Sequence, residues 1–156
     1  MSGYCIFFAL LLSFNAAASP FITYFYDGDT VKILDNNEEY KLRITNIDAP
    51  ERNQAYGKKS RRALMSLCEG TNINVALSGT DKYQRRLGTL ICNSQNASMW
   101  MLQNGHAWFN SRYSMDGTLL FAEQEARRNK LGLWASKQQT PPWIWRRESW
   151  RKNHPH

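Results

Sequence analysis

Acidic and arginine side chains recur in short motifs of this sequence, and together they could bind a metal ion and a phosphate group. In "DGDT", Asp27 and Asp29 flank a glycine, and "RITNIDAPE" contains Arg43, Asp48 and Glu51. Carboxylate oxygens are ligands that a hard cation such as Ca²⁺ prefers, and a guanidinium binds phosphate through two parallel, charge-assisted hydrogen bonds. This combination suits phosphodiester hydrolysis, because the transition state carries more negative charge than the substrate and fixed cations stabilise it.

A third motif, "DKYQRRLG", adds Lys82, Tyr83 and Arg85. Each motif also has an ordinary structural interpretation. Asp-Gly is a common hairpin turn, because glycine adopts a positive φ without a steric penalty. Arg43 and Asp48 could form a surface ion pair worth less than about 1 kcal/mol, and "DAPE" could simply begin a helix. No single motif is specific, so the interpretation depends on all of them together.

Hydrophobic patterns predict the elements that must position these motifs. Alternating apolar and β-branched residues predict strands over 21–26, 30–34, 39–45, 71–77 and 87–92. Helical spacing predicts helices over 56–68, ending at Gly70, over 97–105, and over 119–134, closed by Gly132. The expected fold is α+β and mainly β: a five-stranded Greek-key barrel of the OB type with about three helices.

Length and charge limit the organisation of the chain. Its 156 residues are enough for one domain. The formal net charge of +7 favours a polyanionic partner such as nucleic acid or an anionic surface. We expect the domain over 19–134 and a basic, Trp- and Pro-rich tail over 135–156. Four tail cations could bind a substrate or belong to a solvated end: Arg146, Arg147, Arg151 and Lys152.

The first residues have the features of a signal peptide. Residues 1–18 carry no charged side chain, are largely apolar, and contain Ala16 and Ala18 in an A-x-A pattern. A membrane anchor is the alternative, but the apolar run is shorter than the ~20 residues that span a bilayer. We therefore expect an exported protein, periplasmic or secreted, without a membrane anchor. Cleavage would leave Cys68 and Cys92, which could form a disulfide or remain buried thiols.

The three motifs, in this order, resemble the staphylococcal (micrococcal) nuclease family. The later "NGHAW", "EARRNKLGLW" and "PPWIWRR" are similar to exported Gram-negative bacterial members, and the resemblance covers roughly 22–147. It implies an OB-fold nuclease domain and a monomeric, Ca²⁺-dependent phosphodiester hydrolase. The implied substrates are DNA and RNA, cleaved with little sequence preference to leave 3′-phosphate ends. No stable protein partner is implied.

The resemblance also implies roles for individual residues. Asp29 and Asp48 match the carboxylates that hold Ca²⁺, the backbone carbonyl of Ala49 matches a further ligand, and Asp27 matches a supporting acid. Gly28 is expected to form the turn that presents Asp29 to the metal.

The catalytic and substrate-binding positions are matched as well. Arg43 and Arg85 match the pair that binds the scissile phosphate, and Glu51 matches the residue proposed to activate water as a general base. Three residues match positions beside the nucleotide: Lys82, Tyr83 and Tyr113.

The resemblance brings the end of the first helix beside the last barrel strand, which favours the disulfide between Cys68 and Cys92. Two other functions are weighed against a nuclease. An OB-type module could bind nucleic acid without cutting it, and a cationic protein could bind an anionic envelope surface. Neither alternative accounts for the complete set of acids and arginines.

Overall fold

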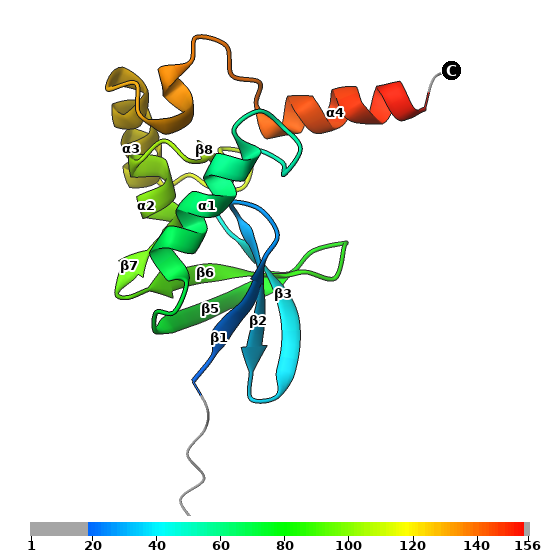
Figure 1. Ribbon diagram of the computed structural model, residues 1–156, viewed down its shortest axis with the longest axis vertical. Helices are drawn as coiled ribbons and strands as arrows, with labels where there is room; N and C mark the ends of the chain where they lie inside the picture. Colours follow the sequence, from blue (N-terminus) through cyan, green and yellow to red (C-terminus); the bar gives the residue numbers. More distant parts are fainter. Residues whose placement is uncertain (1–18, 155–156) are drawn as a thin grey trace, which may run out of the picture.

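Five strands of alternating apolar residues curl into a barrel-like sheet, as the computed structural model shows in Figure 1. The structure describes residues 19–154, so the signal peptide predicted over 1–18 lies outside the described residues. The barrel strands are β1 (Phe21–Phe25), β2 (Thr30–Asp35), β3 (Glu38–Ile44), β5 (Ile73–Thr80) and β6 (Arg86–Cys92). Their order is β1-β2-β3-β6-β5, and β3 and β6 are parallel while the other pairs are antiparallel. This topology confirms the α+β, OB-type fold.

Helices gather at one end of the barrel (Figure 1). They are α1 (Gly57–Cys68), α2 (Ala97–Gln103), α3 (Gly117–Arg128) and α4 (Pro142–Asn153), with a 3₁₀ turn, η1, at Gly132–Ala135. Three two-residue strands complete the description: β4 (Ile47–Asp48), β7 (Gln95–Asn96) and β8 (Trp108–Phe109). Within residues 19–154, no helix has the length and hydropathy needed to span a membrane.

One expectation about the C-terminal third is wrong. The helix predicted over 119–134 ends at Arg128, where Asn129 caps it, and Gly132 begins the separate 3₁₀ turn. Lys130 has a φ of 54°, so the chain leaves the helix before it reaches Gly132. The segment expected to be a tail contains α4, which Pro142 opens at a position that favours proline.

The core lies where the inward-facing residues of the sheet meet the helices. Val31 and Ile33 of β2 and Leu42 and Ile44 of β3 are fully buried, as strand alternation requires. Buried residues of α1 and α2 close the end of the barrel at which the helices gather: Leu64, Leu67, Met101 and Leu102. The packed core fixes the ends of β2 and β3, from which the polar motifs project.

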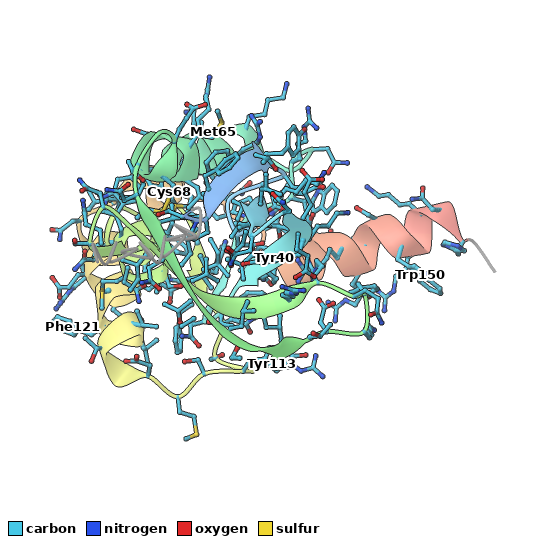
Figure 2. The ribbon with its side chains drawn as sticks, turned by 90° about the horizontal axis from the view of Figure 1, so that it is seen from below. Tyr40, Met65, Cys68, Tyr113, Phe121 and Trp150 are labelled. Atoms are coloured by element: carbon cyan, nitrogen blue, oxygen red, sulfur yellow. A yellow bond between two sulfur atoms is a disulfide. The ribbon has the colours of Figure 1, made fainter. Side chains whose placement is uncertain are left out.

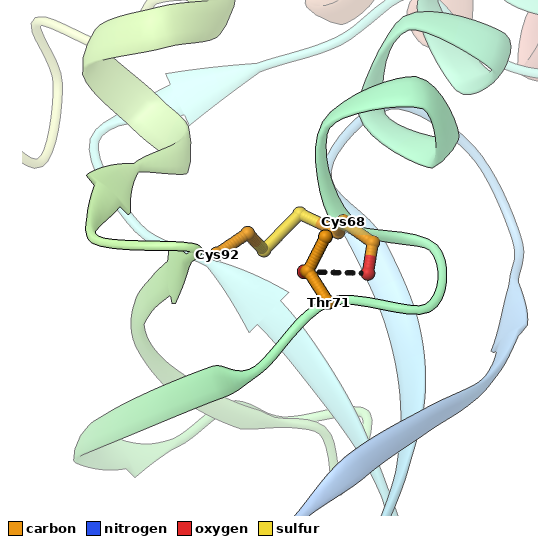
Figure 3. Close-up of a disulfide and its surroundings, with 3 residues drawn as sticks. All are labelled: Cys68, Thr71 and Cys92. Carbon is orange, nitrogen blue, oxygen red and sulfur yellow. Dashed lines mark hydrogen bonds between the residues drawn. A yellow bond between two sulfur atoms is a disulfide. The ribbon is translucent and has the colours of Figure 1, made fainter.

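A disulfide joins Cys68, the last residue of α1, to Cys92, the last residue of β6 (Figure 3). Their Cα atoms are 5.1 Å apart, and the sequence separation is 24 residues. Thr71 supports the turn after α1 by donating its hydroxyl to the carbonyl of Cys68 at 2.9 Å. The disulfide thus links α1, which follows the "DAPE" loop, to strand β6 of the barrel.

We predict that replacing both cysteines by serine lowers the free energy of unfolding by about 3 kcal/mol, because a cross-link across a loop of this length restricts the unfolded chain. Urea denaturation with and without reductant measures the loss. Mass spectrometry of the unreduced protein provides the control, and two free thiols there would contradict the prediction.

Candidate active site

Polar residues that are distant in the sequence meet beside the end of β3. The turn between β1 and β2 carries Asp29, β3 carries Arg43, and β4 carries Asp48. Thr30 is paired with Arg43 across the β2–β3 ladder, and the backbone N–H of Ile44 donates to the carbonyl of Asp29 at 2.8 Å. The register of β2 against β3 therefore brings "DGDT" into contact with "RITNIDAPE".

The guanidinium of Arg43 is the centre of this cluster. Its Nε lies 3.2 Å from Asp29 Oδ1, and its Nη2 lies 3.1 Å from Asp48 Oδ1. Its Nη1 donates to the carbonyls of Ile44 and Ile47, at 2.5 and 2.9 Å. The side chain is only 13% exposed, so Arg43 holds both aspartates and folds the 44–48 segment around itself.

The carboxylate of Asp29 is held by several donors. Its Oδ2 accepts the backbone N–H of Ala49 at 2.6 Å, and its Oδ1 accepts the hydroxyl of Thr30 at 2.9 Å. Asp27 lies beside it and accepts the backbone N–H of Asp29 at 2.9 Å. Burial and the neighbouring charge of Asp29 raise the pKa of Asp27 to about 8. The crowding of acids is therefore energetically unfavourable without nearby positive charge.

Gly28 lies in the turn between β1 and β2, as expected, but a positive φ is not the reason for a glycine there. It is absent from the glycines with a positive φ, so the turn does not use a left-handed conformation there. A Cβ at Gly28 would instead lie 1.9 Å from Ser60 Oγ and 2.9 Å from Ala49 Cβ. Glycine is required because the acidic turn packs directly against α1 and the segment after β4.

Glu51 lies at the mouth of the cluster with its side chain 31% exposed. Gln54 fixes this loop, because its Oε1 accepts the backbone N–H of Glu51 at 3.1 Å and its Nε2 donates to the carbonyl of Thr140 at 2.6 Å. Gln54 is buried. It joins the Glu51 loop to the segment that precedes α4.

Arg85 is not in ion contact with the aspartate cluster. Its Nε and Nη2 each lie 2.8 Å from Asp81 Oδ2 within the turn between β5 and β6. Burial acts against the charge of Asp81, but hydrogen bonds from Arg85 and the backbone lower the pKa of Asp81 overall. Leu87 of β6 is paired with Arg43 in the parallel β3–β6 ladder, and Arg85 lies two residues before Leu87. It therefore lies at the edge of the strand pair that carries the site.

The three residues expected beside the nucleotide are on the surface. Tyr83 is 67% exposed, and the cations of Lys82 and Arg85 lie 5.0 and 5.6 Å from its ring centroid. Tyr113 is 76% exposed in the segment before α3, and Arg112 lies over its ring. The structure thus places Lys82 and Tyr83 beside Arg85, whereas it brings Tyr113 into no described contact with the acidic cluster.

Arg146 contributes to the site in a way that no sequence motif indicated. From α4, Arg146 donates Nη2 to Asp48 Oδ2 at 2.7 Å and Nη1 to Asp48 Oδ1 at 3.1 Å and to Glu51 Oε1 at 2.8 Å. Burial alone would lower the pKa of Arg146, but these two carboxylates raise it well above its usual range. The "PP" at 141–142 is a signal for the start of a helix, but no sequence pattern shows which carboxylates the helix reaches.

The donor set fits a hard divalent cation. Asp29, Asp48 and Glu51 supply three carboxylates against the two guanidiniums of Arg43 and Arg146, so one negative charge is left over. Within residues 19–154 no group of three or more His, Cys, Asp or Glu side chains has metal-binding geometry. A cation would therefore bind to the two buried aspartates and to other oxygens, such as backbone carbonyls and water, which is a typical ligand mixture for Ca²⁺.

Comparisons with known proteins agree with this arrangement. A family model described as "Staphylococcal nuclease homologue" matches residues 41–136. An "Uncharacterized endonuclease" of Escherichia coli O157:H7 is 38% identical over 121 residues, which are 77% of this chain and 79% of that protein. A "Micrococcal nuclease" of Shigella flexneri is 36% identical over 134 residues, 79% of this chain and 77% of that protein. Asp29 and Arg146 lie outside the range of the family model.

The buried position of Arg43 leads to a stability prediction. Arg43→Met should lower the free energy of unfolding by about 3 to 5 kcal/mol in metal-free buffer, because it leaves two buried carboxylates without their shared partner. Arg128→Met removes a guanidinium from an exposed pair with Glu125 and should cost less than about 1 kcal/mol. Urea denaturation compares the two variants, and equal losses would show that Arg43 is not the centre of the cluster.

Proposed function

Because the chain belongs to the staphylococcal nuclease family and is thus a phosphodiester hydrolase, we propose that it is an exported, Ca²⁺-dependent enzyme that cleaves DNA and RNA. The observation that carries the proposal is the contact of Arg43 with both Asp29 and Asp48 at the end of the barrel. Buried acids need a cation, and Arg43 on β3 and Arg85 in the turn between β5 and β6 offer positive charge to a phosphate.

The metal site consists of residues that the fold already holds in place. Asp29 and Asp48 would be the carboxylate ligands, and the backbone carbonyl of Ala49 would be a further ligand. Asp27 supports the turn by accepting the backbone N–H of Asp29. Ca²⁺ bound there supplies positive charge to the phosphate. Arg43 keeps the two carboxylates close together despite their mutual repulsion.

Glu51 is the proposed general base. It is the most exposed of the three carboxylates that contact arginine in the cluster, so water reaches it while the aspartates remain buried. A carboxylate at the mouth of the site can accept a proton from the water that attacks the phosphorus. Gln54 sets its position by holding the backbone of the loop.

Arg85, Lys82 and Tyr83 form the substrate-facing turn. The guanidinium of Arg85 can exchange its bond with Asp81 for one with the phosphate, where a preorganised donor stabilises the additional charge of the transition state. The exposed ring of Tyr83 can stack on any base. Contacts to phosphate charge and stacking on a base depend little on the nucleotide sequence, which supports cleavage of DNA and RNA with little sequence preference. Membership of the family supports 3′-phosphate products.

Metal dependence tests the function directly. We expect the purified protein to cut both single-stranded DNA and RNA in the presence of Ca²⁺, to stop on addition of a chelator, and to recover when Ca²⁺ is restored. End-group analysis should find 3′-phosphates. Undiminished cleavage in the chelator would refute the Ca²⁺ dependence, and tight binding without cleavage would favour a nucleic-acid-binding module.

Two substitutions test the assigned roles. Arg85→Ala should lower kcat by about 10² or more with a smaller change in KM, because it removes a donor that acts mainly in the transition state. Glu51→Gln should lower kcat by about 10² to 10⁴ at saturating Ca²⁺, because it removes the proton acceptor.

The neighbouring Arg86, which pairs with Glu38 on the barrel surface, provides the control. Steady-state kinetics on a short DNA substrate should give nearly unchanged constants for Arg86→Ala. Turnover near that of the unmodified protein in Arg85→Ala would remove Arg85 from the catalytic machinery.

A further inference from the structure

The guanidinium of Arg146 covers the mouth of the acidic cluster. It forms a bidentate contact with Asp48, in which Nη2 donates to Oδ2 at 2.7 Å and Nη1 donates to Oδ1 at 3.1 Å. Its Nη1 also donates to Glu51 Oε1 at 2.8 Å. Its own side chain is 45% exposed, whereas the side chain of Asp48 is only 5% exposed. Arg146 therefore lies between the buried carboxylate and the solvent from which a cation must arrive.

The helix that carries Arg146 is fixed at its start and projects freely beyond. Pro142 is buried, and the ring of Trp143 lies 5.6 Å from that of Trp108 in an edge-to-face contact. Further along, Trp150 is 58% exposed, and Figures 1 and 2 both show α4 extending away from the barrel. In the described part of the chain, the side-chain hydrogen bonds that join α4 to the acidic cluster all come from Arg146. Its ion pairs are thus the main polar tether of the helix.

Arg146 and a divalent cation require the same carboxylate. Both oxygens of Asp48 accept from Arg146, and Oδ1 also accepts from Arg43 at 3.1 Å. A divalent ion on Asp48 would lie within a few ångströms of the Arg146 guanidinium, and at that distance the repulsion between the two positive charges is large in a partly buried site. The guanidinium of Arg146 and the divalent cation therefore compete for the oxygens of Asp48.

We propose that Arg146 is a built-in competitor of the divalent cation: it occupies Asp48 and Glu51 in the metal-free protein, leaves Asp48 when the cation binds, and so sets the metal concentration at which the enzyme becomes active. This proposal rests on the proposed Ca²⁺-dependent function. In the absence of metal, the guanidinium of Arg146 compensates the negative charge of Asp48 and Glu51. Glu51 therefore stays paired until a cation is present. It also assigns α4 to the active site, although the helix lies beyond the residues that the family model matches.

Direct Ca²⁺ binding tests the competition without measuring activity. Isothermal titration calorimetry on the full chain should give a dissociation constant about 10-fold lower for Arg146→Gln than for the unmodified protein, since a paired, charge-assisted contact no longer has to be broken. Arg147→Gln is the matched control, because it removes the same charge from the next residue, and its effect should stay within about twofold owing to screening by salt. Equal affinities for the two variants would overturn the proposal.

Hydrogen exchange on the unmodified protein provides a second readout that does not depend on the variant folding. Ca²⁺ should increase amide exchange of α4 several-fold, because the helix loses its polar tether. Unchanged or slower exchange would contradict the proposal. Failure of the unmodified protein and of Arg146→Gln to bind Ca²⁺ would refute the proposed Ca²⁺ dependence, whereas equally strong binding by both would refute only the role of Arg146.

Discussion

The ion pairs of Arg43 with Asp29 and Asp48 are the interaction on which the site depends. Each partner is almost completely buried, so each charge has lost most of its hydration and must regain that energy from the others. Arg43 also binds two backbone carbonyls of the segment that leads to Asp48. One side chain near the end of β3 thus holds the two carboxylates close together and fixes the segment that leads to Asp48.

The surrounding fold keeps this cluster rigid from several directions. Asp48 is paired with Trp108 in the short β4–β8 ladder, and buried Glu123 of α3 accepts the backbone N–H of Phe109 at 3.1 Å. Close packing of Gly28 against Ser60 ties the acidic turn to α1, which the disulfide in turn joins to β6. Residues without any catalytic role therefore define where the acids lie, because a buried charge tolerates little displacement of its partners.

Hydrophobic patterns in the sequence predict those strands and helices that short stretches of the chain determine by themselves. The five barrel strands and the first two helices follow from the alternation and spacing of their apolar residues. The two-residue strands β4 and β8 carry no periodicity and form only because tertiary packing aligns them. Motif order grouped Asp29, Arg43 and Asp48 correctly, but the close approach at Gly28 and the long-range ion pairs of Arg146 depend on contacts between distant segments. Arg85 was placed in the correct turn, although its contact with Asp81 was not foreseen.

Four acids, Asp27, Asp29, Asp48 and Glu51, lie close together where a barrel end, the disulfide-tied helix α1 and the C-terminal helix α4 meet. The two aspartates held by Arg43 are the proposed metal site. Anomalous scattering from crystals of the protein soaked in a lanthanide that substitutes for Ca²⁺ locates the ion most directly. We expect one strong peak between the carboxylates of Asp29 and Asp48, with the guanidinium of Arg146 withdrawn from Asp48. A peak remote from both aspartates, or no ordered ion at saturating concentration, would contradict it.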